Sequence, residues 1–141
     1  MNAIDDMRYR KTRTIVGIVI MLLIAAIHTF RLGNYLNGKL YIYYYSFASD
    51  FIIPFGFYFL LCMNDIQIKF LRKWYMKAGI VFGLSTVTEI LQYFGIYILG
   101  VTFDIFDIIM FGFGVLTAGI IDKQLFKRWI PFWEKKLVPI K

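Results

Sequence analysis

Four long apolar runs, separated by short polar segments, dominate the pattern of this sequence. They cover residues 14–30, 46–63, 78–99 and 102–121. An α-helix needs about 20 predominantly apolar residues to cross the hydrocarbon core of a bilayer, and each run is close to that length. The pattern therefore predicts an all-α membrane protein whose single domain, residues 1–141, contains four transmembrane helices.

The polar segments differ in character. Residues 31–45 contain turn-forming Gly and Asn residues and then a group of tyrosines, Tyr41, Tyr43, Tyr44 and Tyr45. These rings suit the headgroup level of a membrane, although a lip that faces a substrate is an alternative. Residues 122–141 form a basic segment that also carries Trp129, Phe132 and Trp133. That mixture predicts an interfacial C-terminal segment lying on the membrane surface.

Composition supports the membrane assignment. Hydrophobic residues make up 60% of the chain and charged residues 18%, whereas about a quarter of a soluble domain is charged. The first run is longer than the apolar region of a signal peptide and no small-x-small cleavage motif follows it, so we expect a retained helix. The single cysteine, Cys62, excludes an intrachain disulfide and fits an apolar packing position.

The placement of bases predicts the topology. Fourteen of the 16 Lys and Arg residues lie in residues 1–13, 64–77 and 122–141, and the other two are Arg31 and Lys39. With four spans, the positive-inside rule places both termini in the cytoplasm. Attraction to anionic lipids explains the net charge of +7. Membrane lipids are therefore the expected partners, nucleic acid is unnecessary, and a membrane-protein partner or a second copy of the chain stays open.

Polar residues inside the apolar runs mark the candidate site, because an acid in hydrocarbon is costly. The predicted topology places them in the outer half of the bilayer, and the inner half is expected to contain almost none. With a rise of ~1.5 Å per residue, Gln92 and Glu89 lie roughly 10 and 15 Å below the outer end of the third helix. The predicted binding pocket comprises Glu89, Gln92, Asp104, Asp107, Asp50, Arg31 and His28.

The spacing brings several of these residues onto shared helix faces. Glu89 lies four residues after Ser85 and three before Gln92, so the three share one face. The fourth helix carries a stripe at spacings of three and four: Asp104, Asp107, Phe111, Gly114 and Ala118. Its small residues allow a neighbouring backbone to approach closely. We therefore expect Glu89 and Asp107 to face each other inside the bundle.

Four carboxylates gathered in one region cannot all remain charged and unpaired. They must bind a cation, pair with Arg31 or His28, take up protons, or contact water. Glu89, Asp107 and Asp50 offer the oxygen ligands that divalent cations such as magnesium or calcium bind, although no spacing specifies a metal. A divalent cation is therefore a candidate cofactor.

Structural roles are open for the same residues. Glu89 and Gln92 can join neighbouring helices by hydrogen bonds, and Asp104 can cap the fourth helix by accepting backbone N–H groups. The sequence contains no HExxH, P-loop or GxSxG motif, so it identifies no catalytic residue.

The segment Glu89–Ile90–Leu91–Gln92, followed by Gly100–Val101–Thr102–Phe103–Asp104 and Asp107, resembles the VanZ-like family of small bacterial membrane proteins. The family pattern is E-x-x-Q in one span, a short turn with G-R, and D-x-x-D followed by Asn and Gly in the next span. Glu89, Gln92, Asp104, Asp107 and Gly114 match this pattern. Val101 stands in place of the arginine and Phe111 in place of the asparagine. The resemblance covers about the last third of the chain.

The resemblance implies a multi-pass protein of the bacterial cytoplasmic membrane with a role in the cell envelope. Founding members of the family are linked to low-level resistance to glycopeptide antibiotics of the teicoplanin type. We therefore expect a protein whose outer polar pocket binds a lipid or a lipid-linked headgroup. One alternative is a metal-dependent enzyme acting on such a lipid, with Glu89 or Asp107 as the base. Another is a small partner subunit of a membrane complex, in which the acids only hold helices together.

Overall fold

The computed structural model describes residues 3–65, 67–96 and 103–134, which form helices joined by turns and contain no strand. The first helix is α1 (Ala3–Thr29). The second is continuous over Lys39–Met63 and consists of α2 (Lys39–Tyr43), a π-helical turn (Tyr44–Ala48) and α3 (Ser49–Met63). The third is α4 (Trp74–Tyr93). The last, Ile105–Trp129, consists of α5 (Ile105–Ile120), a π-helical turn (Ile121–Phe126) and α6 (Lys127–Trp129).

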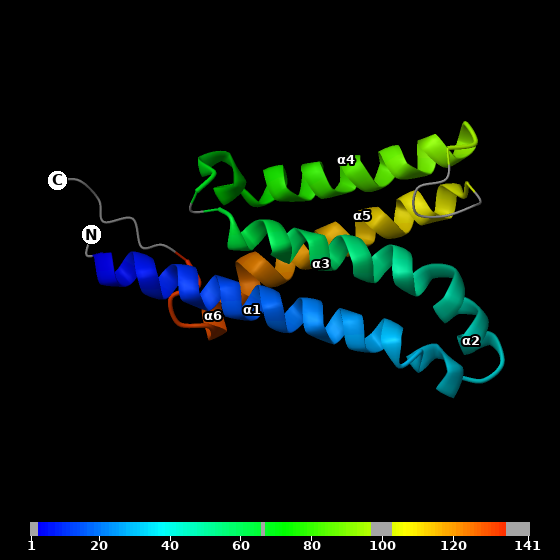
Figure 1. Cartoon of the computed structure of the whole chain (residues 1–141), viewed down its shortest axis with the longest axis horizontal. Helices are drawn as coiled ribbons and strands as arrows, with labels where there is room; N and C mark the ends of the chain where they lie inside the picture. The colour runs from blue at the N-terminus through cyan, green and yellow to red at the C-terminus, as the bar shows by residue number, and fades with distance from the viewer. Residues whose placement is uncertain (1–2, 66, 97–102, 135–141) are drawn as a thin grey trace.

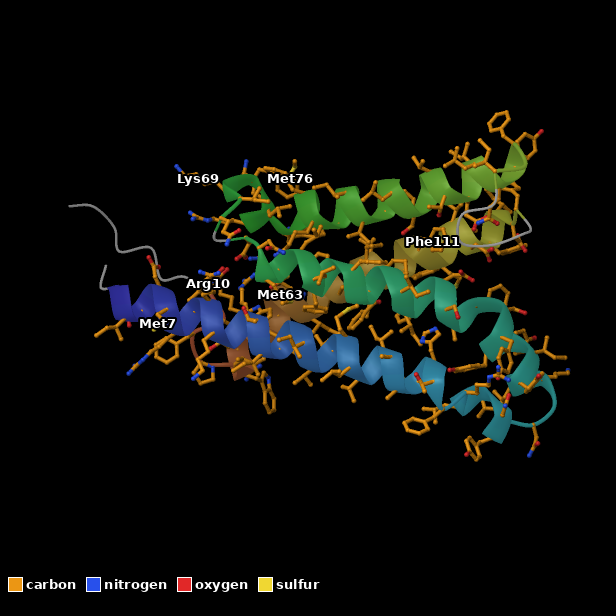
Figure 2. All side chains as sticks on the ribbon, in the orientation of Figure 1. Met7, Arg10, Met63, Lys69, Met76 and Phe111 are labelled. Atoms are coloured by element: carbon orange, nitrogen blue, oxygen red, sulfur yellow. The ribbon has the colours of Figure 1, made fainter. Side chains whose placement is uncertain are left out.

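Successive long helices run antiparallel, and α3 lies between α1 on one side and α4 and α5 on the other (Figure 1). The start of α1, the turn between α3 and α4, and α6 lie at one end of the bundle (Figure 1). Figure 2 shows Arg10 and Lys69 at this end. We call it the basic end, because exposed bases gather there: Arg8, Arg10, Lys11, Lys69, Lys73 and Arg128. The opposite end, which contains Asp50, Glu89, Asp104 and Asp107, is the acidic end.

Three helices are long and apolar enough to cross a membrane: Ile4–Thr29, Lys39–Met63 and Ile105–Trp129. Large apolar side chains such as Leu22, Leu84 and Leu116 are exposed on the outside of the bundle, where lipid would cover them. Both features indicate a multi-pass membrane protein. Helix α4, the predicted third span, is not among the three, because Lys77, Glu89 and several other polar residues lower its hydropathy.

The helix boundaries differ from the apolar runs. The first, second and last helices extend beyond their runs into the polar flanks, from Ala3, from Lys39 and to Trp129. Helix α4 ends at Tyr93, before the predicted limit at Leu99. Gly95 has φ +78°, and the N–H groups of Gly95 and Ile96 bond to the carbonyls of Gln92 and Leu91 over 2.9 Å each. This is a Schellman motif, which ends a helix by satisfying its last carbonyl groups.

Close contact between α3 and α5 depends on a glycine. A Cβ atom at Gly114 would overlap the carbonyl oxygen of Phe51 on α3, so only glycine permits this approach of the two backbones. Ala118, one turn further along α5, is fully buried. The prediction that small residues on this stripe allow close helix packing is confirmed.

The hydrophobic core lies toward the basic end and includes Tyr58, Phe59, Cys62, Val115 and Trp133. Buried Cys62 fits its predicted packing role. The prediction that the C-terminal segment only lies on the membrane surface is wrong for Trp133, which is 1% exposed, whereas Trp129 is 76% exposed. Trp133 is drawn inward because its indole N–H finds a hydrogen-bond acceptor on the last helix, Asp122.

Candidate functional site

Glu89 and Gln92 are buried on the face of α4 that packs near α5. Their exposed fractions are 5% and 6%, and Gln92 Nε2 donates to Glu89 Oε1 over 3.0 Å. The other carboxylate oxygen, Glu89 Oε2, lies 3.5 Å from the backbone nitrogen of Asp104 at the start of α5. Helices α4 and α5 lie side by side here (Figure 1). Glu89 therefore lies between protein helices rather than on a lipid-facing surface.

Asp104 caps α5, as one of the sequence alternatives predicted. Its Oδ1 accepts a hydrogen bond from the backbone N–H of Phe106 over 2.9 Å, and its side chain is exposed. Such a cap satisfies one of the backbone donors that a helix N-terminus leaves free. The cap also holds the Asp104 carboxylate at the acidic end, beside Glu89.

Asp107, one helical turn further along α5, faces Asp50 of α3. Their half-buried carboxyl groups lie near each other, and the charges of Glu89 and Asp104 act on both. We expected Asp107 to face Glu89; the acid that acts on it most strongly is Asp50, followed by Glu89. We call Asp50, Glu89, Asp104 and Asp107 the acid cluster.

His28 and Arg31, which we expected in the same pocket, lie at the exposed end of α1. The His28 ring contacts the Ile24 carbonyl over 2.9 Å and Ser49 Oγ over 3.4 Å. Among the described residues, no ion pair joins His28 or Arg31 to an acid. The reason is the helix order: α1 packs against α3, which separates it from α4 and α5.

The acid cluster has no positively charged partner in the part of the chain that the structure describes. The linker 97–102, outside the described residues, contains no Lys, Arg or His. No three His, Cys, Asp or Glu side chains among the described residues, including Glu89, Asp107 and Asp50, come close enough together to hold a metal ion. The cluster offers hydrogen-bond acceptors and negative charge, which suit protons or a positively charged donor.

A second charged cluster, which the sequence analysis missed, is buried at the basic end. Arg13 forms an ion pair with Asp65, and its guanidinium also lies 3.6 Å from Asp122. Lys77 Nζ lies 3.1 Å from Asp122 Oδ2, and these two residues are 0% and 1% exposed. We call these four residues the buried ion cluster. All four residues flank the predicted spans by one or two positions, and the sequence did not predict that they pair with one another.

Hydrogen bonds satisfy the buried ion cluster from several sides. Asp122 accepts from the Tyr58 hydroxyl over 2.7 Å and from Trp133 Nε1 over 2.8 Å. Arg13 Nε donates to the Trp133 carbonyl over 3.0 Å, and the guanidinium lies 4.5 Å from the Trp133 ring centroid. Two bases balance two acids, and each charge has partners, which is the condition under which buried charges are tolerated. This cluster therefore holds the fold together.

The segment after α6 is fixed beside this cluster. Glu134 accepts hydrogen bonds from Lys123 and Lys127, with N···O distances of 3.2 and 2.7 Å. Partial burial raises the pKa of Glu134, but the hydrogen bonds and charges of the two lysines outweigh it and leave the pKa below its ordinary value. Residues 133 and 134 are thus attached to the last helix.

The sequence contains a signal for part of the buried ion cluster. Lys77 precedes the buried Val81 by four residues, and Asp122 follows the buried Ala118 by four, so both continue buried helix stripes into polar flanks. Both residues also lie in the basic segments 64–77 and 122–141, which the sequence predicts to be on the surface. Asp65 lies in the turn after α3, where no helical spacing predicts burial.

Comparison with protein-family models, with curated proteins and with solved structures finds no match for this chain.

Proposed function

We propose that this chain is a VanZ-like protein of the bacterial cytoplasmic membrane that binds a lipid or lipid-linked headgroup at the acid cluster. In this proposal α4 is a fourth span and both termini lie in the cytoplasm, because most bases lie at the basic end. The acid cluster then lies in the outer half of the bilayer. A link to glycopeptide resistance of the teicoplanin type is part of what the resemblance suggests.

The observation that carries this proposal is the difference between the two charged clusters. The buried ion cluster contains its own bases, whereas the acid cluster has none among the described residues. The helices α3, α4 and α5 nevertheless bring their acids together at the acidic end. Ionisable groups within a membrane bundle are costly, and a structural role alone would favour paired charges. An external group that completes the acid cluster accounts for the arrangement.

A test is to purify the full chain from membranes in mild detergent and to identify the lipids that stay bound by mass spectrometry. Glu89→Gln keeps the shape of the side chain and one oxygen that can accept from Gln92 Nε2, and it removes the charge. We expect the wild-type chain to retain a lipid and Glu89→Gln to lose most of it while unfolding at a similar or higher temperature. Asp5→Asn, which removes an exposed carboxylate at the basic end, is the matched control and should retain the lipid.

Equal lipid retention by wild type and Glu89→Gln would contradict the proposed site. A Glu89→Gln chain that unfolds at a clearly lower temperature would instead assign Glu89 a structural role between α4 and α5.

A further inference from the structure

Two buried polar atoms without partners flank Glu89 on α4. Among the described residues, the buried side-chain nitrogen and oxygen atoms that lack a hydrogen bond are Thr86 Oγ1 and Gln92 Oε1. Thr86 precedes Glu89 by three residues and Gln92 follows it by three, so both lie on the same side of the helix. Buried polar atoms are nearly always hydrogen-bonded, so unpartnered atoms point to a group that completes them.

Gln92 contacts the acid cluster through its amide group, whose oxygen Oε1 has no hydrogen-bond partner. The amide nitrogen of the same side chain donates to Glu89 Oε1 over 3.0 Å, and this contact fixes the orientation of the amide, because the opposite orientation would set two acceptor oxygens against each other. The amide oxygen, on the same carbon atom as the donating nitrogen, is therefore left without a partner, and Gln92 is 6% exposed. A neutral acceptor thus lies beside the charged ones.

The chemistry of this site consists almost entirely of acceptors. Carboxylate oxygens only accept when ionised, the amide oxygen only accepts, and no base among the described residues supplies donors. A phosphate group would meet repulsion here. A divalent cation would need several converging ligands, and no such group exists among the described residues.

We infer that the acid cluster recognises a protonated primary amine, with Glu89 and Gln92 Oε1 accepting hydrogen bonds from its N–H groups. This inference rests on the proposed function and names the chemical class of its ligand. An alkylammonium carries positive charge and three N–H donors, which match a carboxylate and an unpaired amide oxygen. Asp50 and Asp107 add negative charge around it. The amine can come from an aminophospholipid headgroup or from a soluble molecule.

The test measures binding to the purified full chain in detergent by native mass spectrometry and by the shift in unfolding temperature. The probes are phosphatidylethanolamine, phosphatidylcholine and phosphatidylglycerol with identical acyl chains, together with soluble ethanolamine. Phosphatidylcholine keeps the positive charge and lacks N–H donors. We expect phosphatidylethanolamine to bind about tenfold or more tightly than phosphatidylcholine, because charge-assisted hydrogen bonds are lost on methylation.

Two variants locate the binding. Glu89→Gln and Gln92→Met should each remove most of the preference for phosphatidylethanolamine, and Asp5→Asn should leave it unchanged. Unfolding without lipid shows that each variant is folded. Binding of both ethanolamine and phosphatidylethanolamine supports recognition of the amine alone, and binding of the lipid only supports an aminophospholipid headgroup.

The outcomes separate the inference from the proposed function. If the three lipids bind equally and Glu89→Gln weakens all of them, the headgroup site stands and recognition of a primary amine is overturned. If no probe binds the wild-type chain, or if binding is unchanged in Glu89→Gln, both the inference and the proposed function are overturned.

Discussion

At the scale of single residues, Asp122 and Glu89 show two treatments of a buried carboxylate. Asp122 receives hydrogen bonds from a tyrosine, a tryptophan and a lysine. Glu89 receives one from Gln92 and a long contact of 3.5 Å from a backbone N–H. A buried carboxylate whose partners all come from the protein stabilises the native packing. A buried carboxylate that lacks partners is available to a ligand.

Replacement of Asp122 tests the structural role of the buried ion cluster. Replacing Asp122 by Asn keeps its volume and leaves the buried Lys77 without an acidic partner, whereas Arg13 keeps its ion pair with Asp65. Removing one partner of a buried ion pair costs about 3–5 kcal/mol, so the free energy of unfolding in detergent should fall by that order. The matched control is Asp5→Asn at an exposed position on α1. A change in Asp122→Asn as small as the control would contradict the structural role of the buried ion cluster.

At the scale of elements, contact between α3 and α5 determines the arrangement of the bundle. Alanine substitutions at two nearby glycines of α5, Gly114 and Gly112, test this contact. A Cβ atom at Gly114 would overlap Phe51, whereas a Cβ atom at Gly112 would make an ordinary contact of 3.6 Å with the Phe82 ring. Gly114→Ala should lower the free energy of unfolding by about 1–3 kcal/mol through overpacking. Gly112→Ala should have no cost, because alanine favours the helix.

Equal unfolding midpoints for Gly114→Ala and Gly112→Ala, measured by denaturant titration in detergent, would show that the two helix backbones are further apart than the structure has them.

The C-terminal segment is the second element whose role can be measured. Trp133 is buried against Phe59, Phe126 and Arg13, so Trp133→Ala should cost about 3–5 kcal/mol of unfolding free energy. The control, Trp129→Ala, removes an exposed ring and should change stability by less than about 0.5 kcal/mol. If Trp129→Ala lowered the free energy of unfolding and Trp133→Ala left it unchanged, this segment would act only as a surface anchor.

The sequence predicted the helices better than their ends. Apolar runs located all four long helices, and spacing predicted the tight contact at Gly114. The cap at Asp104 was one of the alternatives that the sequence left open. The ends of α1 and of the last helix were missed because the apolar runs stop at the polar residues Arg13 and Asp122. The helices continue through both residues, which tertiary contacts bury. Spacing also placed the acids on facing helices. It did not reveal that α3 separates α1, with His28 and Arg31, from the other acids.

At the scale of the whole molecule, Lys and Arg residues are distributed unequally: fourteen of the 16 lie in residues 1–13, 64–77 and 122–141. The proposed topology follows from this asymmetry and can be tested with an impermeant thiol reagent in intact cells. Cysteines at Asn37 and at Gln67 replace exposed residues at opposite ends. Cys62 is buried, so the wild-type chain provides an unreactive background.

We expect the cysteine at position 37 to be labelled from outside and the cysteine at position 67 only after permeabilisation. Equal labelling of both from outside would exclude four spans with a cytoplasmic basic end.

We propose that a ligand provides the missing partners of the acid cluster, whereas the protein itself provides the partners of the buried ion cluster. An experimental structure of the full chain in lipid nanodiscs that contain phosphatidylethanolamine tests it most directly. We expect non-protein density near Asp50 and Asp107 that reaches Glu89 and Gln92 Oε1 at hydrogen-bonding distances of about 2.7–3.2 Å. Glu89 pointing into lipid, or Gln92 Oε1 paired with another protein group and no density among the acids, would contradict it.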